Sequence, residues 1–247
     1  MTIKFSLPQK YISKVASTNF LNKIDLEVLF EVIEPNTLEF IPGQFISINC
    51  GNGTFRSYSI SSSSLSKTQV GLIVAVAHEG IGSNFLKNLK VGDTVEFIGP
   101  SGRFVLPENL KETLVFLATG TGVAPILSMI DYLANTQSDA NIKLYFGIRD
   151  SKELFKLDQI RDLKNKLKSF DYKICFSQEL PKELDTNCIK GRVTDAFNIK
   201  DFDIASTQYF ICGNPYMVTE VSEALENNFV PKENIFHEKF TTAQKKV

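Results

Sequence analysis

The pattern of apolar and polar residues in the first hundred positions predicts several short strands. In residues 26–32, Leu, Val, Phe and Val occupy every second position, and glutamates fall at two of the positions between them. This pattern is typical of a strand with one buried face. A second strand is expected over residues 44–48, further β-rich runs cover 71–77 and 94–98, and Pro42-Gly43 marks a turn. The pattern predicts an antiparallel β-barrel or sandwich.

One short helix interrupts these strands. Residues 83–89 begin with Ser83, which can cap a helix N-terminus, and Phe85, Leu86 and Leu89 can share an apolar face. We therefore expect a helix over 83–89.

The second half of the chain has a different rhythm, in which apolar runs alternate with helical patterns. Residues 114–118 are all apolar, as expected for a strand buried on both faces. The other expected strands are 142–148, 172–176, 208–212 and 235–240, and the expected helices lie near 126–134, 153–167 and 218–227. Such alternation predicts βαβ units and a mostly parallel sheet.

The two rhythms predict two domains, an N-terminal antiparallel β-barrel over residues 1–108 and a C-terminal α/β domain over residues 109–247, with residues 107–113 as the connector. Hydrophobic residues make up 43% of the 247-residue chain, which argues against disorder. The net charge of −1 gives no reason to expect binding to nucleic acid or insertion into a membrane.

The spacing of the cysteines and histidines does not predict a metal site. Four cysteines are scattered without a C-x-x-C pair, which disfavours a zinc ribbon or a plant-type iron–sulfur cluster. His78 and His237 are too far apart in sequence to suggest a shared ligand set. The chain lacks a signal-peptide pattern and an apolar stretch of about 18 residues. We therefore expect a soluble, cytoplasmic protein, and a monomer.

A glycine-rich loop, residues 120–125, lies between the apolar strand and the helix that follows it. Its glycines allow backbone amides to approach a phosphate, and the helix N-terminus favours negative charge. Pro125 replaces the third glycine of the dinucleotide fingerprint, so the loop is not the usual Rossmann signature. By itself, the loop leaves nucleotide binding and a plain turn equally open.

The strand over residues 142–148 ends at Arg149, where a NAD-binding Rossmann unit carries an acidic residue. A basic group at this position could face a phosphate. An ordinary exposed arginine paired with Asp150 is the favoured alternative.

A polar strand end, Arg56-Ser57-Tyr58-Ser59, offers further chemistry. Arg56 could pair with a pyrophosphate, and Tyr58 on the same strand face could stack on a planar ring. A serine hydroxyl can bond a ring nitrogen. As composition alone, the segment also suits a structural strand end.

Five segments in order resemble the ferredoxin–NADP⁺ reductase family. They are residues 56–59, 80–86, 99–100, 117–125 and 212–217. The resemblance extends from about residue 24 to residue 240. It implies a flavoprotein oxidoreductase that transfers hydride between NAD(P)H and bound FAD and passes electrons to or from a carrier such as ferredoxin or flavodoxin. FMN is the less expected flavin.

The resemblance implies a flavin site in the barrel. Arg56 would bind the pyrophosphate, Tyr58 would stack on the isoalloxazine ring, and Ser59 would lie near its N5 atom. Gly82 and Ser83 would offer backbone amides to the pyrophosphate. The implied flavin-binding residues are Arg56, Ser57, Tyr58, Ser59, Val74, Gly80, Gly82, Ser83 and Phe240.

The resemblance also implies a nicotinamide site, with Thr121 touching the nucleotide and Cys212 beside the nicotinamide ring. The implied residues are Gly120, Thr121, Gly122, Arg149, Ser177, Arg192, Gly213 and Met217, and Ser59, Cys212 and Glu238 are the catalytic candidates. A buried structural cysteine is the alternative for Cys212.

The end of the chain extends the resemblance. Phe240 would cover the flavin face opposite Tyr58, and Glu238 would lie near N5. In plant-type members the aromatic residue is the last one, but here seven residues follow Phe240. How Phe240 would move aside is therefore open, and a core phenylalanine is the alternative.

The choice of coenzyme and of electron acceptor is less defined. Gln178 stands where NADP-specific relatives carry an arginine, although Arg149, Lys190 and Arg192 could compensate, so NADPH is slightly favoured over NADH. The alternatives for function are a reductase subunit of a multicomponent oxygenase or other complex, a free-flavin reductase, and a non-catalytic nucleotide-binding module.

Overall fold

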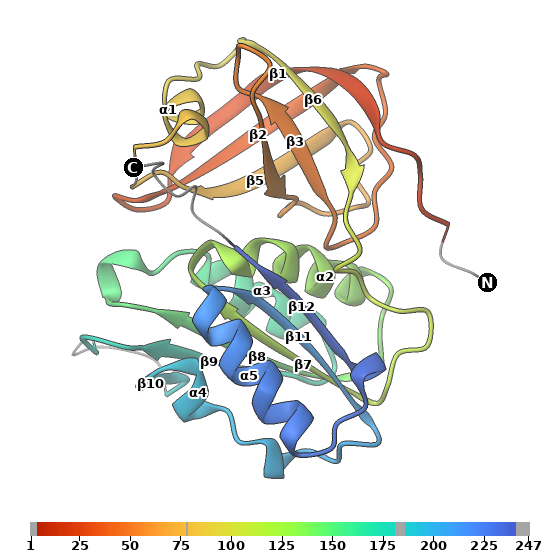
Figure 1. Cartoon of the computed structure of the whole chain (residues 1–247), viewed down its shortest axis with the longest axis vertical. Helices are drawn as coiled ribbons and strands as arrows, with labels where there is room; N and C mark the ends of the chain where they lie inside the picture. The colour runs from red at the N-terminus through yellow and green to blue at the C-terminus, as the bar shows by residue number, and fades with distance from the viewer. Residues whose placement is uncertain (1–3, 78, 181–185, 241–247) are drawn as a thin grey trace. The chain divides into compact units, whose positions relative to one another are not determined.

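The computed structural model describes residues 4–77, 79–180 and 186–240 (Figure 1). His78 and the seven residues after Phe240 lie outside the described residues. Internal contacts divide the chain into two compact units. Unit 1 comprises Met1–Glu108 and Ala124–Thr136, and unit 2 comprises Asn109–Val123 and Gln137–Val247. No helix among the described residues is long and apolar enough to cross a membrane.

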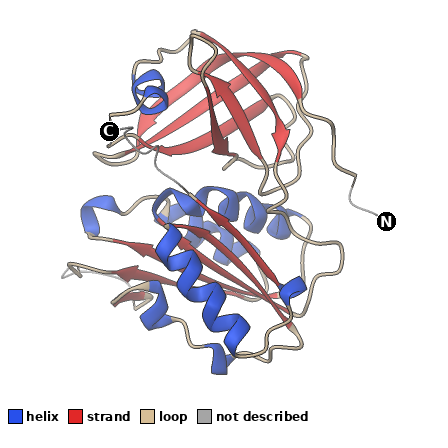
Figure 2. Ribbon diagram, viewed as in Figure 1, coloured by secondary structure: helices blue, strands red, loops and turns tan. Residues whose placement is uncertain are grey.

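Unit 1 contains a six-stranded sheet in the order β4-β3-β6-β1-β2-β5, in which all neighbours are antiparallel (Figure 2). The strands are β1 (Gln9–Phe20), β2 (Asp25–Glu34), β3 (Phe45–Asn49), β4 (Phe55–Ser59), β5 (Gln69–Ala75) and β6 (Thr94–Ser101). Just after β4, Ile60 forms an antiparallel bridge with Leu72 of β5. This bridge brings the two edge strands together, so the predicted antiparallel barrel is confirmed and is nearly closed.

The core of the barrel follows the period-two pattern. Leu26, Val28, Phe30 and Val32 of β2 are all buried. Strand β1 went unpredicted because its buried face includes a polar residue, Ser13, whose hydroxyl donates to the carbonyl of Val95 at 2.8 Å. Its pairing with β2 is also interrupted by register shifts, and a bulge breaks strict alternation.

Helix α1 spans Ile81–Lys87, two residues earlier than predicted. The predicted cap at Ser83 is wrong, because Gly80 is the N-cap residue. Ser83 lies inside the first turn, and its hydroxyl donates to the carbonyl of Ala75 at 3.4 Å. The serine therefore ties the helix to the end of β5 instead of starting the helix.

Unit 2 contains a second six-stranded sheet, in the order β10-β9-β8-β7-β11-β12. All its neighbouring strands are parallel, so the predicted mostly parallel sheet is entirely parallel. The strands are β7 (Thr113–Thr119), β8 (Asn141–Ile148), β9 (Phe170–Phe176), β10 (Cys188–Lys190), β11 (Thr207–Gly213) and β12 (Ile235–Lys239). Residues 114–118 of β7 are buried throughout, as predicted.

The helices of the second half are α2 (Val123–Asn135), α3 (Leu157–Lys166), α4 (Val193–Ala196) and α5 (Pro215–Asn227). The predicted helix over 153–167 is shorter, because Ser151–Glu153 form a separate 3₁₀ turn. From Ala124 onward, α2 groups with unit 1.

The order of strands in unit 2 marks one place for a ligand. From β7 the chain adds β8, β9 and β10 outward on one side, and it then returns to add β11 and β12 on the other side. The strand order therefore reverses between β7 and β11. In open α/β sheets, ligands bind outside the carboxyl ends of the strands at such a switch point.

Candidate active site

Arg56 and Tyr58 lie on the same face of β4 and contact the first turn of α1. A Cβ atom on Gly82 would lie 3.0 Å from Cγ of Arg56 and under 3.0 Å from the hydroxyl oxygen of Tyr58. Real Cβ atoms essentially never approach a neighbour this closely. Only glycine fits at this position, and the prediction that Arg56 and Tyr58 share a face is confirmed.

The start of α1 lies against the side chain of Arg56. No side chain in the described part of the chain caps this helix at Gly80, so the first backbone N–H groups lack partners within the helix. The side chain of Arg56 is half-buried. Its aliphatic part lies against this turn, and its guanidinium donates to the backbone carbonyl of Phe55 at 2.8 Å. Uncapped helix amides and a nearby arginine are groups that suit a pyrophosphate, so these residues fit the pyrophosphate of FAD.

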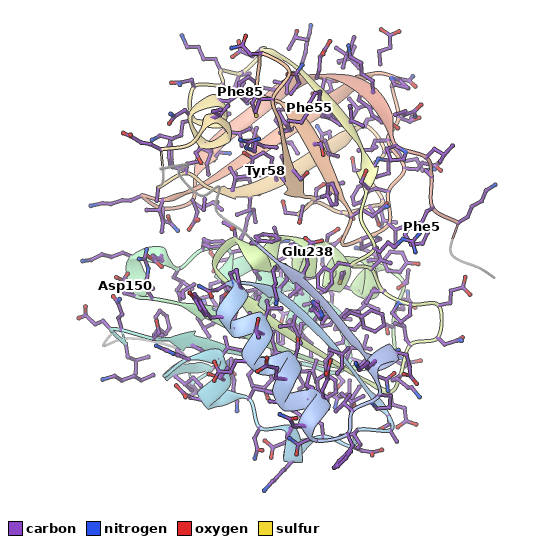
Figure 3. All side chains as sticks on the ribbon, in the orientation of Figure 1. Phe5, Phe55, Tyr58, Phe85, Asp150 and Glu238 are labelled. Carbon is purple, nitrogen blue, oxygen red and sulfur yellow. The ribbon has the colours of Figure 1, made fainter. Side chains whose placement is uncertain are left out.

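Tyr58 is half-buried, and this burial raises the pKa of its phenol well above the ordinary value. The nearby Cys50 raises the pKa further, and the charge of Arg56 opposes both effects. The phenol therefore stays neutral, and its ring remains a suitable surface for stacking. Figure 3 labels Tyr58 on the ribbon of unit 1.

The other predicted flavin-binding residues differ in where their side chains lie. Ser59 is buried at the end of β4, opposite Phe45 of β3. Ser57 is exposed, and its hydroxyl is 3.0 Å from that of Ser47, so its side chain does not join Arg56 and Tyr58. Val74 is part of the barrel core, where it fills space.

In unit 2 the glycine-rich loop lies at the switch point. Gly120–Gly122 form a 3₁₀ turn directly after β7. A Cβ atom on Gly122 would lie 2.5 Å from the carbonyl oxygen of Cys212 and 2.5 Å from Cα of Gly213. The loop after β7 and the end of β11 therefore approach one another as closely as backbones can. Gly213 has a φ of +131°, which favours glycine.

Thr119 holds these two strand ends together. Its hydroxyl oxygen accepts a hydrogen bond from the backbone N–H of Asn214 at 2.8 Å. The side-chain oxygen of Asn214 in turn accepts from the N–H of Tyr216 at 2.9 Å and caps α5. Thr119 was not among the predicted site residues. The signal for it is its place as the last residue of a buried strand before the glycine loop.

Cys212 and Glu238 are neighbours across β11 and β12. The two residues are directly paired in the register of these parallel strands. Cys212 is fully buried, and this burial raises the pKa of its thiol well above the ordinary value, with a further rise from the negative charge of Glu238. The thiol is therefore neutral at physiological pH. Figure 3 labels Glu238 on unit 2.

Phe240 and Met217 have different surroundings within unit 2. Phe240 is half-buried directly after β12, and its backbone N–H donates to the carbonyl of Gly213 at 2.9 Å. The backbone of Phe240 is thereby fixed at the carboxyl end of β11. Met217 packs in the core with Val115 and Leu117, so its contribution to a site would come through packing.

Arg149 at the end of β8 and Ser177 at the end of β9 are the residues predicted to face a phosphate, but the charge of Arg149 is paired. Arg149 forms an ion pair with Glu153, four residues later, whereas the carboxylate of Asp150 accepts from the N–H of Lys152 at 2.8 Å. Our expectation of an Arg149–Asp150 pair is thus replaced by a pair with Glu153. The hydroxyl of Ser177 donates to the carbonyl of Ile148 at 3.4 Å.

Arg192 lies further along the chain, at the start of α4. Its side chain is exposed, and its backbone N–H donates to the carboxylate of Asp195 at 2.7 Å.

Two family models match the chain. Residues 21–106 match the oxidoreductase FAD-binding domain, and residues 116–223 match the oxidoreductase NAD-binding domain. The first match covers most of the barrel strands, and the second covers β7 to most of α5.

Curated relatives cover most of this chain. The electron transfer component of 2-halobenzoate 1,2-dioxygenase from Burkholderia cepacia is 30% identical over 240 residues, which is 93% of this chain and 69% of the relative. The reductase component of propane 2-monooxygenase from Rhodococcus jostii is 31% identical over 214 residues, which is 85% of this chain and 58% of the relative. The chain thus spans about three fifths to two thirds of the length of these relatives.

Solved structures share the fold. A cytochrome P450 reductase from Amycolatopsis has a TM-score of 0.86 at 25% identity, over 96% of this chain and 71% of that one. A ferredoxin NADP⁺ reductase from Neisseria gonorrhoeae, with bound FAD and NADP, has a TM-score of 0.76 at 21% identity, over 94% and 98%. The two matched domains and the 2-halobenzoate 1,2-dioxygenase relative show that the chain belongs to the ferredoxin–NADP⁺ reductase family.

Proposed function

We propose that this chain oxidises NADH or NADPH with the help of bound FAD and passes the electrons to a separate redox protein. The observation that carries the proposal is the pairing of Cys212 with Glu238 beside the switch point of an NAD-binding domain. Bound FAD would supply the ability to accept a hydride and release electrons one or two at a time. The protein's residues supply binding, orientation and electrostatics.

Within this proposal, residues 1–108 hold the flavin. The guanidinium of Arg56 and the amides at the start of α1 bind the pyrophosphate, a proposal supported by the packing of the Arg56 side-chain stem against Gly82 in the first turn of α1. Tyr58 offers a neutral aromatic face for the ring. Ser59, which is buried at the end of the same strand, offers a hydroxyl to a ring nitrogen.

Residues 109–247 hold the nicotinamide nucleotide. The amides of Gly120–Gly122 bind its phosphates at the start of α2. Cys212 acts as a neutral thiol, since its raised pKa excludes a thiolate, and it shields the ring from water. Glu238 provides the negative charge beside it, and Phe240 provides an aromatic ring at the carboxyl end of β11.

The preferred coenzyme in this proposal is NADH. A 2′-phosphate needs a cation, and the charge of Arg149 is already balanced by Glu153. Gln178 and Glu179 at the end of β9 add no positive charge. These side chains reverse the slight preference for NADPH that the sequence suggested.

The proposed acceptor is a redox protein of an oxygenase system. Relatives of the chain are the reductase component of propane 2-monooxygenase and the electron transfer components of toluate and 2-halobenzoate dioxygenases. Ferredoxin and flavodoxin are the carriers to test first.

The test is made on the purified full chain, reconstituted with FAD and passed through gel filtration. We expect the protein to stay yellow and to oxidise NADH with ferricyanide. Cys212→Ser should lower kcat, whereas Cys188→Ser, a cysteine on strand β10, should leave it unchanged. Protein that takes up no flavin would refute the proposal. Loss of flavin on the column would indicate a free-flavin reductase, and tight binding without turnover would indicate a nucleotide-binding module.

A further inference from the structure

Helix α2 carries a buried serine that bonds to the barrel. The side chain of Ser128 is fully buried, and its hydroxyl donates to the backbone carbonyl of Ser62 at 2.8 Å. The two residues are 66 positions apart in sequence, and both belong to unit 1. One residue further along α2, the methyl group of Met129 packs where a Cβ atom of Gly43 would otherwise lie. The helix therefore contacts two separate loops of the barrel.

The segment that Ser128 bonds is the direct continuation of the flavin strand. Strand β4 carries Arg56 and Tyr58 and ends at Ser59, and residues 60–62 follow it. Ser62 is three residues beyond Ser59. Only two residues therefore separate the Ser62 carbonyl from the strand end that carries Ser59 and Tyr58.

Other bonds hold this segment only from the barrel side. The N–H of Ile60 donates to the carbonyl of Gln44 at 2.9 Å, and the N–H of Ser61 donates to the carbonyl of Gly71 at 2.8 Å. The hydroxyl oxygen of Ser62 accepts from the N–H of Gly71 at 3.0 Å. The bond from Ser128 comes from a helix, and it fixes the end of the segment that is furthest from β4.

We infer that Ser128 is a positioning residue, which orders residues 59–62 and so pre-forms the flavin-contacting end of β4. The inference rests on the proposed function, since it requires that flavin binds at Arg56 and Tyr58. Without the hydroxyl, the carbonyl of the half-buried Ser62 loses the donor that α2 provides, which favours alternative positions of the segment. In the flavin-free protein, only a fraction of molecules then holds the competent arrangement.

The apparent dissociation constant for flavin increases in inverse proportion to that fraction. Loss of one net hydrogen bond corresponds to a change of about 3- to 10-fold in such an equilibrium. We therefore expect Ser128→Ala to weaken flavin binding by about 5-fold. The glycine loop at Gly120–Gly122 is untouched, so KM for NADH should stay the same.

The experiment measures FAD binding to the flavin-free full chain by quenching of flavin fluorescence, together with the visible circular dichroism of the bound flavin. The matched control is Ser222→Ala on α5 in unit 2, a serine hydroxyl that has no hydrogen-bond partner among the described residues. We expect Ser128→Ala to bind FAD more weakly and to alter the circular dichroism of the bound flavin, and we expect the control variant to match wild type in both measurements. Ser62→Ala, which removes the second side-chain anchor, should show a non-additive effect in combination with Ser128→Ala.

Two results separate the possible failures. If Ser128→Ala lowers the melting temperature but binds FAD like wild type with an unchanged flavin spectrum, Ser128 is only structural and the inference is wrong. If the wild-type chain itself binds no FAD, the proposed function fails and the inference fails with it.

Discussion

Gly82→Ala tests the geometry of the flavin site directly. The added methyl group would lie under 3.0 Å from the hydroxyl of Tyr58, 3.0 Å from Cγ of Arg56 and 3.3 Å from Cβ of Arg56. Either Tyr58 swings away or α1 moves off β4. Overpacking of this kind costs about 1–3 kcal/mol. Because both responses disturb the groups proposed to hold FAD, the dissociation constant for FAD should rise about 5- to 150-fold.

The comparison for this substitution is Gly80→Ala, which adds a methyl group to the same predicted flavin-binding turn without the clash. A Cβ atom on Gly80 meets no atom within 4 Å, and its φ of −143° is open to any residue. The assay is fluorescence titration of the flavin-free protein with FAD, alongside thermal unfolding of each variant. If Gly82→Ala binds FAD within two-fold of Gly80→Ala, the placement of Arg56 at the pyrophosphate and of Tyr58 at the flavin ring is wrong.

Three further predictions follow from single residues. Phe229, which follows α5, has a φ of +62° and a side chain that is 87% exposed. Because this backbone conformation is strained for a phenylalanine, Phe229→Gly should raise the free energy of unfolding in urea by about 1 kcal/mol. An unchanged free energy would show that the backbone is not strained there. Burial raises the pKa of the Cys175 thiol to about 12, above its ordinary value near 9. The buried neutral thiol therefore contributes fully to the stability of the folded state below pH 9, and this contribution is lost as the pH rises towards 12. In urea unfolding over pH 9–11, the free energy of unfolding of Cys175→Ala should fall less steeply than that of wild type, by about 1.4 kcal/mol per pH unit. Glu153→Gln, which removes the negative charge paired with Arg149, should lower KM for NADPH relative to NADH about 2- to 5-fold, while Asp158→Asn, at the exposed ion pair with Arg161, should not.

The sequence predicted well the parts of the fold that depend on local pattern. The uniformly apolar run of β7 reflects burial on both faces, and the alternation in β2 reflects burial on one face. The residue pattern along each strand is therefore enough to predict the strand. Strand β1 was not predicted because one of its buried positions is a serine, Ser13, whose hydroxyl donates a hydrogen bond to the carbonyl of Val95. That bond depends on a strand more than 80 residues away, which no local window contains.

The candidate site divides in the same way. The glycine loop and the Arg56–Tyr58 pair can be found from sequence, because a strand–loop–helix unit and a shared strand face are local properties. The ion pair of Arg149 with Glu153 could not be distinguished from one with Asp150, since a turn separates the residues and its geometry decides the partner. The neutral state of Cys212 depends on complete burial and on the neighbouring strand, both of which are tertiary properties.

Glycines serve the same physical purpose in both halves of the proposed site. Gly82 allows Tyr58 and Arg56 to lie against the start of α1, and Gly122 allows the loop after β7 to lie against Cys212 and Gly213. The neighbours differ, because Gly82 approaches side chains whereas Gly122 approaches the backbone of the adjacent strand end. A side chain can turn away from an added methyl group more easily than a strand backbone can shift. Substitution of Gly82 should therefore act on flavin affinity more than on the fold, and substitution of Gly122 should destabilise unit 2 itself.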